Sequence, residues 1–243
     1  LQAEVVNHYH SYNFLSVYQK IHNFCVTELG GFYLDVIKDR QYTTQVDSRA
    51  RRSTQTAMLQ VVEMLSRMIA PILSFTADEI WQHIPGDRVD SVFLSDFEEG
   101  HSALEESGEF DDAFWRRILE VKTAVNRELE VQRAEKKVGS GLSAEVDLFC
   151  DGQLADDLAR LGEELRFVLI VSRASVNTGT PAPEQAIATE VSGLSLRVTA
   201  SEHKKCERCW HHREDVGQEA AHAGLCLRCV SNVAGDGELR RFA

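Results

Sequence analysis

The sequence lacks the long hydrophobic runs that membrane insertion requires. No stretch approaches 18 consecutive apolar residues, so we expect no transmembrane helix. The first ten residues, LQAEVVNHYH, lack a basic segment followed by an apolar one, so we also expect no signal peptide and a cytoplasmic location. They include no initiator methionine and have a pattern typical of the middle of a helix, so we expect the chain to be part of a longer protein.

Motifs for independent catalysis are missing as well. The sequence has no glycine-rich phosphate loop, and no set of Ser, His and Asp residues supports a catalytic triad. No segment repeats at a fixed period, which argues against a repeat architecture. We therefore predict no catalytic residue in this chain.

The net charge of −12 at first argues against nucleic-acid binding, but the charge is unevenly distributed. Between Pro85 and Phe114 ten acidic residues accompany Arg88 alone: Asp87, Asp90, Asp96, Glu98, Glu99, Glu105, Glu106, Glu109, Asp111 and Asp112. Basic residues gather elsewhere, in IKDR at 37–40, RARR at 49–52 and KK at 136–137. The overall acidity therefore leaves room for local basic surfaces that meet phosphates.

The first part of the chain has the pattern of a helical bundle. Asn13 is a candidate N-cap for a helix that we expect Gly30 and Gly31 to end, and residues 32–43 have the mixed pattern of an irregular or extended segment. Ser53–Ile69 carries an apolar stripe at helical spacing and stops before Pro71. A capping box at Thr76–Glu79 predicts one more short helix.

The periodicity changes after a long helix predicted from Ala113 to about Lys137. Asp111 or Asp112 is its expected N-cap, and Gly139 and Gly141 are expected to stop it. Three β-rich runs follow, at 144–150, 166–176 and 193–200, and a helical leucine pattern separates the first two. This order predicts a small α/β unit.

Four of the six cysteines stand in two pairs near the end of the chain. Cys206 and Cys209 belong to CERCW, and Cys226 and Cys229 belong to CLRC, which gives the spacing C-x2-C-x16-C-x2-C. In a reducing compartment such pairs indicate metal ligands rather than disulfides. Two knuckle turns supply four thiolates in the tetrahedron that Zn2+ prefers, with no position left for a reacting water. The spacing predicts one structural zinc ion, which would stabilise a tail too small to hold a core alone.

The other candidate ligands are less favoured. Four histidines near the cysteines offer an alternative to one thiolate, but four cysteines suffice, so we interpret the histidines as facing solvent or RNA; they are His203, His211, His212 and His222. Cys25 and Cys150 lie far from the pairs in sequence and have the pattern of small buried residues.

Basic and aromatic residues surround the first cysteine pair. Trp210 offers a plane on which an unpaired base can stack, and Arg208 and its basic neighbours can pair with phosphates. Two other interpretations stay open at this point. Trp210 packs over the zinc knuckle in one of them, and in the other the basic residues are simply solvated, because the acids of the tail match its Lys and Arg residues in number.

Four stretches of the chain resemble one known family. They are FYLDVIKDRQYT, RRSTQTAMLQVVEMLSRMIAPILSFTADEIW, VNRELEVQRAEKKVGSGLSA, and the tail from KCERCW to ELRRFA. The second stretch is similar to the anticodon-binding bundle shared by the isoleucine, valine, leucine and methionine enzymes of class I aminoacyl-tRNA synthetases. The cysteine tail with CVSNVAGDGE is typical of the isoleucine enzymes. Over essentially its whole length the chain resembles the C-terminal part of bacterial-type isoleucyl-tRNA synthetases.

The resemblance implies a mainly α fold in three parts. These are a helical-bundle anticodon-binding domain (1–110), a long helix with a small α/β junction domain (111–200), and a zinc-knuckle tail with four cysteine ligands (201–243). It implies that Cys206, Cys209, Cys226 and Cys229 bind one structural zinc ion.

The resemblance also implies an activity for the whole enzyme, which would attach isoleucine to its tRNA using ATP and Mg2+. A separate domain would edit mischarged valine, because a hydrophobic pocket discriminates weakly against a missing methylene. The HIGH-like and KMSKS-like ATP-site signatures of the class do not occur in this sequence. We therefore expect the chain to bind tRNA without activating an amino acid.

We expect the tRNA contacts to lie in two places. Those of the bundle are Lys38, Arg40, Arg49, Arg51 and Arg52, and those of the zinc tail are Arg208, Trp210 and His211. Phosphate contacts would supply most of the binding energy, which should fall with salt. The expected partner is the isoleucine tRNA, bound by a monomer, with no DNA and no membrane. For the arginines near residue 50, ion pairs with the many acids are an equally good interpretation.

Two hypotheses from other classes accompany this one. In the first, the chain is a zinc-stabilised protein-interaction module whose acidic surface, at Pro85–Phe114, meets a basic protein. In the second, it is a metalloenzyme, against which the closed four-cysteine site argues.

Overall fold

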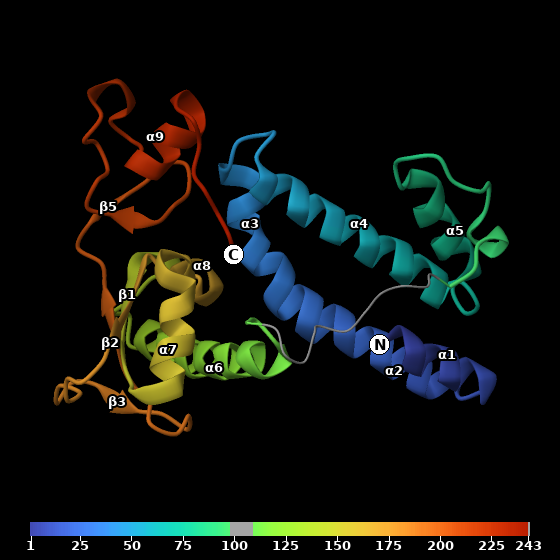
Figure 1. The fold of residues 1–243 in the computed structure, drawn as a ribbon, viewed down its shortest axis with the longest axis horizontal. Coiled ribbons are helices and arrows are strands. Elements are labelled where there is room, and N and C mark those ends of the chain that lie inside the picture. Colours follow the sequence, from blue (N-terminus) through green and yellow to red (C-terminus); the bar gives the residue numbers. More distant parts are fainter. Residues whose placement is uncertain (98–108, 243) are drawn as a thin grey trace. The chain divides into compact units, whose positions relative to one another are not determined.

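The computed structural model describes residues 1–97 and 109–242 (Figure 1). The fold is mainly α with a small α/β part, as predicted. It divides into two compact units, one formed by residues 1–41 and 51–103 and the other by residues 42–50 and 104–243. Four acids of the predicted acidic surface, Glu98, Glu99, Glu105 and Glu106, lie outside the described residues. In the described part, no helix is long and apolar enough to cross a membrane.

The first unit is helical. It contains α1 (Gln2–His10), α2 (Phe14–Asn23), a π-helix (Phe24–Tyr33), most of α3 (Leu34–Thr43) and of α4 (Arg49–Ile69), α5 (Ser74–His83) and a 3-10 turn (Val92–Leu94). Val5, Val17 and Met68 are fully buried where α1, α2 and α4 pack together. The hydroxyl of Tyr9 donates to the Met68 carbonyl at 2.7 Å, so a half-buried aromatic side chain ties α1 to α4 without leaving its polar end unpaired.

Asn13 is the N-cap of α2, as predicted, and its side chain accepts from the Ser16 amide at 3.3 Å. The predicted helix end at Gly30 and Gly31 is wrong, because the helix continues through them as a π-helix into α3. A Cβ at Gly30 would lie 3.1 Å from the Cys25 carbonyl oxygen, and one at Gly31 would lie 3.2 Å from that of Val26. The glycine pair therefore gives room for the wide π turn.

The predicted capping box at Thr76 is also wrong, since α5 begins at Ser74, after Leu73 as N-cap. The apolar residues of α5 do face a core, as expected for a bundle. Trp81 is 2% exposed and donates from Nε1 to the Val89 carbonyl at 2.9 Å. The guanidinium carbons of Arg67 and Arg88 lie 4.7 and 4.8 Å from the centre of its ring. Burial of this ring anchors the helix.

The long helix α6 (Asp112–Ala134) opens the larger part of the second unit. Asp111 caps it by accepting from the Phe114 amide at 2.7 Å, as predicted. The predicted stop at Gly139 and Gly141 comes too late. The helix ends at Ala134, with Glu135 as its C-cap; Lys136 follows with a left-handed φ of 59°, and the Lys137 amide donates back to the Gln132 carbonyl at 2.9 Å. This is a Schellman motif built on lysine instead of glycine.

A mixed four-stranded sheet with strand order β2-β1-β4-β3 forms the α/β part. The strands are β1 (Ala144–Phe149), β2 (Arg173–Asn177), β3 (Ile187–Ala188) and β4 (Ser195–Ala200). β1 runs parallel to β2 and antiparallel to β4. The crossover from β1 to β2 contains α7 (Gly152–Leu161), a 3-10 turn (Gly162–Glu164) and α8 (Leu165–Leu169).

The run at 166–176 is only partly a strand, as α8 takes its first residues and β2 begins at Arg173. All five residues of α8 are buried. A five-residue helix that is buried on every side, Arg166 included, shows no helical periodicity, so its sequence cannot be told from a buried strand. Ile170, with a φ of 58°, ends the helix and turns the chain into β2.

Candidate metal centre

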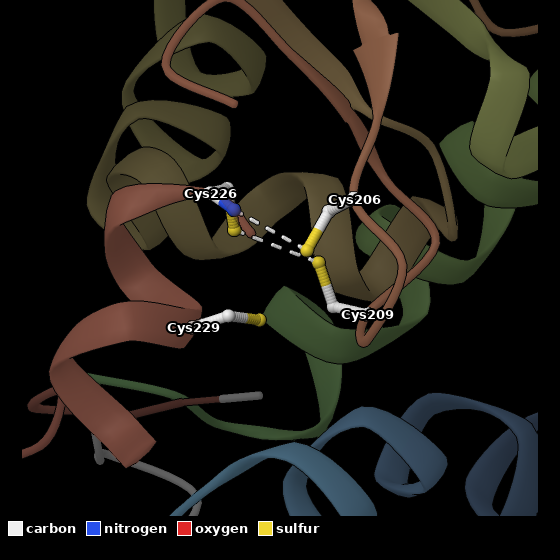
Figure 2. Close-up of side chains that lie close together, drawn as sticks. All are labelled: Cys206, Cys209, Cys226 and Cys229. Atoms are coloured by element: carbon white, nitrogen blue, oxygen red, sulfur yellow. Dashed lines mark hydrogen bonds between the residues drawn. The ribbon is translucent and has the colours of Figure 1, made fainter. Parts of the chain in front are cut away.

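The four cysteines of the tail come from two different local structures (Figure 2). Cys206 and Cys209 lie in the turn between β5 (Lys204–Lys205) and β6 (His212–Arg213), which pair antiparallel. Cys226 is the N-cap of helix α9 (Leu227–Ala234), and Cys229 lies in its first turn. The hairpin and the helix thus hold the two pairs face to face, with the sulfur atoms gathered between them (Figure 2).

The sulfur positions fit a tetrahedral metal ion. All four Sγ atoms lie within 4.8 Å of one another and all four residues are buried. Sγ of Cys209 lies 3.7 Å from Sγ of Cys226. A tetrahedron with Zn–S distances of about 2.3 Å has sulfur–sulfur edges of about 3.8 Å. The Cys226 amide also donates to Sγ of Cys206 at 3.4 Å, which would stabilise a thiolate there.

The four thiols influence one another strongly because their sulfur atoms are so close. The pKa of Cys209 is held far below its usual range because Cys206, Cys226 and Cys229 donate to its sulfur. A hydrogen bond with Cys209 raises the pKa of Cys206, but those with Cys226 and Cys229 outweigh it and lower the value to about 5. The same bonds raise the pKa of Cys226 and Cys229. A divalent cation bound among the four sulfur atoms would stabilise their thiolate forms.

Among the described residues, the group that could hold a metal ion consists of the four cysteines and includes no histidine. His211 is 2% exposed, its Nδ1 lies 3.1 Å from the Cys209 carbonyl, and its ring packs edge-on against Phe167 at 5.5 Å. The prediction that His211 faces solvent or RNA is therefore wrong. Nδ1 of His212 pairs with the His203 carbonyl at 2.8 Å.

The cysteine tail is fastened to the α/β part. The His212 amide donates to Oγ of the fully buried Ser172 at 2.6 Å. At the other end, the amides of Arg241 and Phe242 donate to the two carboxylate oxygens of Glu164 at 2.7 and 2.8 Å. These contacts explain why the tail and the α/β part form one compact unit.

The cations predicted in the bundle differ in exposure. Lys38 is exposed and pairs with Asp35 at 2.5 Å. Arg40 is 8% exposed and donates to Oγ of Ser53 at 3.5 Å, so it does not occupy the surface position that RNA contact requires. Arg49 and Arg52 are exposed, and Arg51 is half-buried.

Two residues of the CERCW turn have distinct surroundings. Trp210 is 60% exposed, which is inconsistent with packing over the knuckle, and Nζ of Lys205 lies 5.3 Å from its ring centre. Its φ of 65° is unusual for a residue with a side chain. Arg208 donates from its guanidinium to the carbonyls of Thr43 and Tyr42, the latter at 3.4 Å. No local pattern could have predicted this contact, because 165 residues separate Arg208 from Thr43.

Comparison with known families agrees with this arrangement. Residues 1–148 match the family described as the anticodon-binding domain of tRNA ligase. The chain belongs to this family. Next to this anticodon-binding domain, residues 204–232 match the zinc finger found in FPG and IleRS, and the match includes all four cysteines. The zinc-finger match and the cysteine cluster together support one structural zinc.

Relatives that match the whole chain are isoleucine–tRNA ligases. The chain is 57% identical to isoleucine–tRNA ligases of Pseudomonas putida (strain W619) and Pseudomonas fluorescens (strain Pf0-1), and 54% identical to that of Pseudomonas paraeruginosa (strain DSM 24068 / PA7). Each match covers all 243 residues of this chain and 26% of the relative. The chain thus spans about a quarter of the length of these curated relatives.

Proposed function

We propose that this chain is the tRNA-binding C-terminal part of an isoleucine–tRNA ligase and that its partner is the isoleucine tRNA. The observation that carries the proposal is the identity of 57% to such a ligase along all 243 residues. The chain grips and positions the anticodon region as a cytoplasmic monomer. ATP- and Mg2+-dependent attachment of isoleucine, and editing of mischarged valine, belong to other parts of the enzyme.

Within this proposal the chain has three parts, divided at residues 110 and 200. Cys206, Cys209, Cys226 and Cys229 are the zinc ligands. When bound, zinc supplies a closed tetrahedral centre that holds the hairpin and α9 together. The fit of the four sulfur atoms to such a centre supports the assignment.

The proposed RNA contacts are the predicted residues whose side chains are accessible. Trp210 stacks on an unpaired base, and Arg208 two positions before it pairs with phosphates. Lys205 was not among the predicted contacts, but its ammonium nitrogen lies 5.3 Å from the centre of the Trp210 ring, and it adds a further cation. The exposed side chains of Lys38, Arg49 and Arg52, and the half-buried Arg51, supply further phosphate contacts. Arg40 and His211 are left out because both are buried.

The test is binding of the purified chain to two transcripts, the isoleucine tRNA and the same tRNA with a valine anticodon. Binding is measured at two salt concentrations, and zinc is determined on the same sample. We expect about one zinc per chain, tighter binding to the isoleucine anticodon, and an affinity that falls as salt rises.

Two results would change the proposal. Equal affinity for both anticodons would assign anticodon specificity to parts of the enzyme outside this chain. This chain would then bind tRNA only by electrostatic attraction to its phosphates. No binding by a folded, zinc-loaded sample would contradict tRNA binding by this chain. Binding of a basic protein that tRNA does not displace would then favour the interaction module.

A further inference from the structure

The two cysteine knuckles share a feature that zinc binding does not require. Each has an arginine directly before its second cysteine, Arg208 in CERC and Arg228 in CLRC. The knuckles face each other across the sulfur cluster, so the geometry of the metal centre also fixes the backbone positions of these two arginines.

Both arginines reach the same residue, Thr43, from opposite knuckles. Arg208 donates to its backbone carbonyl, and Nη1 of Arg228 donates to its hydroxyl oxygen at 3.3 Å. Arg228 is itself oriented by Glu238, whose carboxylate accepts from Nη1 at 3.0 Å. Thr43 is 5% exposed and therefore lies beneath these guanidinium groups rather than at a surface open to RNA.

A third contact joins the same segment to the tail. Nε2 of Gln45 donates to the Gly235 carbonyl, just after α9, at 2.8 Å. Gly237, with a φ of 84°, lies so close that a Cβ there would be 2.5 Å from Oε1 of Gln45. Residues 42–50, which include the exposed Arg49, thus belong to the same compact unit as the zinc tail.

We propose that Thr43 is a positioning residue: its carbonyl and hydroxyl oxygens orient Arg208 and Arg228 and hold the segment 42–50 against the zinc knuckles. The role of this segment in binding rests on the proposed tRNA-binding function. A guanidinium has five N–H donors, so Arg208 can bond to Thr43 and Tyr42 and still present N–H groups to a phosphate. Thr43 then contributes to RNA binding although it does not touch RNA.

Coupling of this kind works in both directions. The knuckles order residues 42–50, including Arg49, and the segment orders the arginines of the knuckles. Loss of zinc should therefore increase the mobility of residues 42–50, which contain no metal ligand. A direct role of Arg208 and Arg228 in phosphate binding alone would give no such effect.

The decisive variant is Thr43→Val in the zinc-loaded full chain. It replaces the hydroxyl by a methyl group, keeps the backbone carbonyl and changes no charge. We expect amide hydrogen exchange in residues 44–50 to become about tenfold faster and affinity for the isoleucine tRNA to fall about three- to tenfold, with zinc content unchanged. Arg228→Lys should have a similar effect, and Thr43→Val added to it should have little more.

Two controls separate positioning from general damage. Thr43→Ser retains the hydroxyl and should exchange and bind like the wild type. Thr123→Val changes an exposed threonine of α6 whose hydroxyl bonds within its own helix, and should alter neither measurement.

Unchanged exchange in Thr43→Val would overturn the proposal. Faster exchange with unchanged RNA affinity would also overturn it, since the segment would then be held without helping RNA to bind. If the wild type bound no tRNA, the proposed function would fail and the RNA-binding part of this inference with it. Amide hydrogen exchange in Thr43→Val would still decide whether Thr43 holds residues 42–50 against the zinc knuckles.

Discussion

The ammonium nitrogen of Lys205 lies 5.3 Å from the centre of the Trp210 ring, at the surface of the CERCW turn. A cation and an exposed aromatic plane stand side by side there, and the ring is 60% exposed although its backbone is held at a φ of 65°. This conformation costs about 1–2 kcal/mol for a residue with a side chain. It belongs to the knuckle turn, in which the Trp210 amide donates to the Cys206 carbonyl and the Cys206 amide to the His211 carbonyl, both at 2.9 Å. The exposure of the ring is what supports the proposed stacking role.

Trp210 allows stacking and backbone strain to be separated. Trp210→Ala should weaken tRNA binding by about 1–3 kcal/mol, the contribution of a stacked base, and Trp210→Phe should retain part of it. Trp210→Gly should bind as weakly as the alanine variant but unfold at a higher temperature than it, because glycine adopts the left-handed region without strain. Binding isotherms and thermal unfolding measure the two effects. Full RNA affinity in Trp210→Ala would contradict the stacking role.

Cys206→Ser should release the metal and unfold the tail locally. We expect zinc content to fall well below one per chain, residues 204–232 to lose protection from hydrogen exchange, and far-UV circular dichroism to keep most of its helical signal. Cys150→Ser is the matched control, because Cys150 is 5% exposed and lies outside the cluster. It should retain zinc, and equal zinc loss in both variants would argue against the ligand assignment.

Gly141 and Gly139 should differ in their tolerance of a side chain. A Cβ at Gly141 would lie 2.5 Å from the Ile170 carbonyl oxygen, whereas one at Gly139 would lie 3.8 Å from Oγ of Ser143. We expect Gly141→Ala to lower the free energy of unfolding by about 1–3 kcal/mol, and Gly139→Ala to change it by less than about 0.5 kcal/mol. Denaturant titration compares the two, and equal stability would show that this approach to Ile170 relaxes freely.

Glu145 should make stability depend on pH. Burial raises its pKa, but hydrogen bonds from Oγ of Ser201 at 2.6 Å and Nε of Arg173 at 2.7 Å outweigh burial and lower the pKa below 4.5. A carboxyl group with a lowered folded-state pKa contributes stability above its unfolded pKa and loses it as the pH falls through the folded value.

Glu145→Gln should therefore be less stable than the wild type by about 1 kcal/mol at pH 7, and the difference should shrink as the pH falls below 4.5. Urea titrations between neutral and acidic pH measure it, with the exposed Glu214→Gln as control. A difference that stays constant with pH would contradict the charge-based account.

Predictions that depend on one residue and its near neighbours were correct at Asn13 and Asp111 and wrong at the Thr76 capping box, because α5 begins at Ser74. Asn13 and Asp111 cap their helices because the bond runs to an amide three residues later. The predictions failed where the packing of the surrounding backbone decides where a helix ends. The Gly30-Gly31 pair looked like a helix end, and only the wide turn around it shows why glycine is needed. Lys136 took the left-handed position that Gly139 and Gly141 were expected to supply.

The sequence by itself determined which four cysteines form the cluster, the cap of α2, and the family to which the chain belongs. Each depends on residue identity at short spacing, and the knuckle spacing alone brings two thiols to one point. Tertiary structure alone decided that His211 is buried against Phe167, that Trp210 is exposed, and that Arg208 and Arg228 meet at Thr43. These relations join residues up to 185 positions apart, and no local pattern records which surfaces come together when the chain folds.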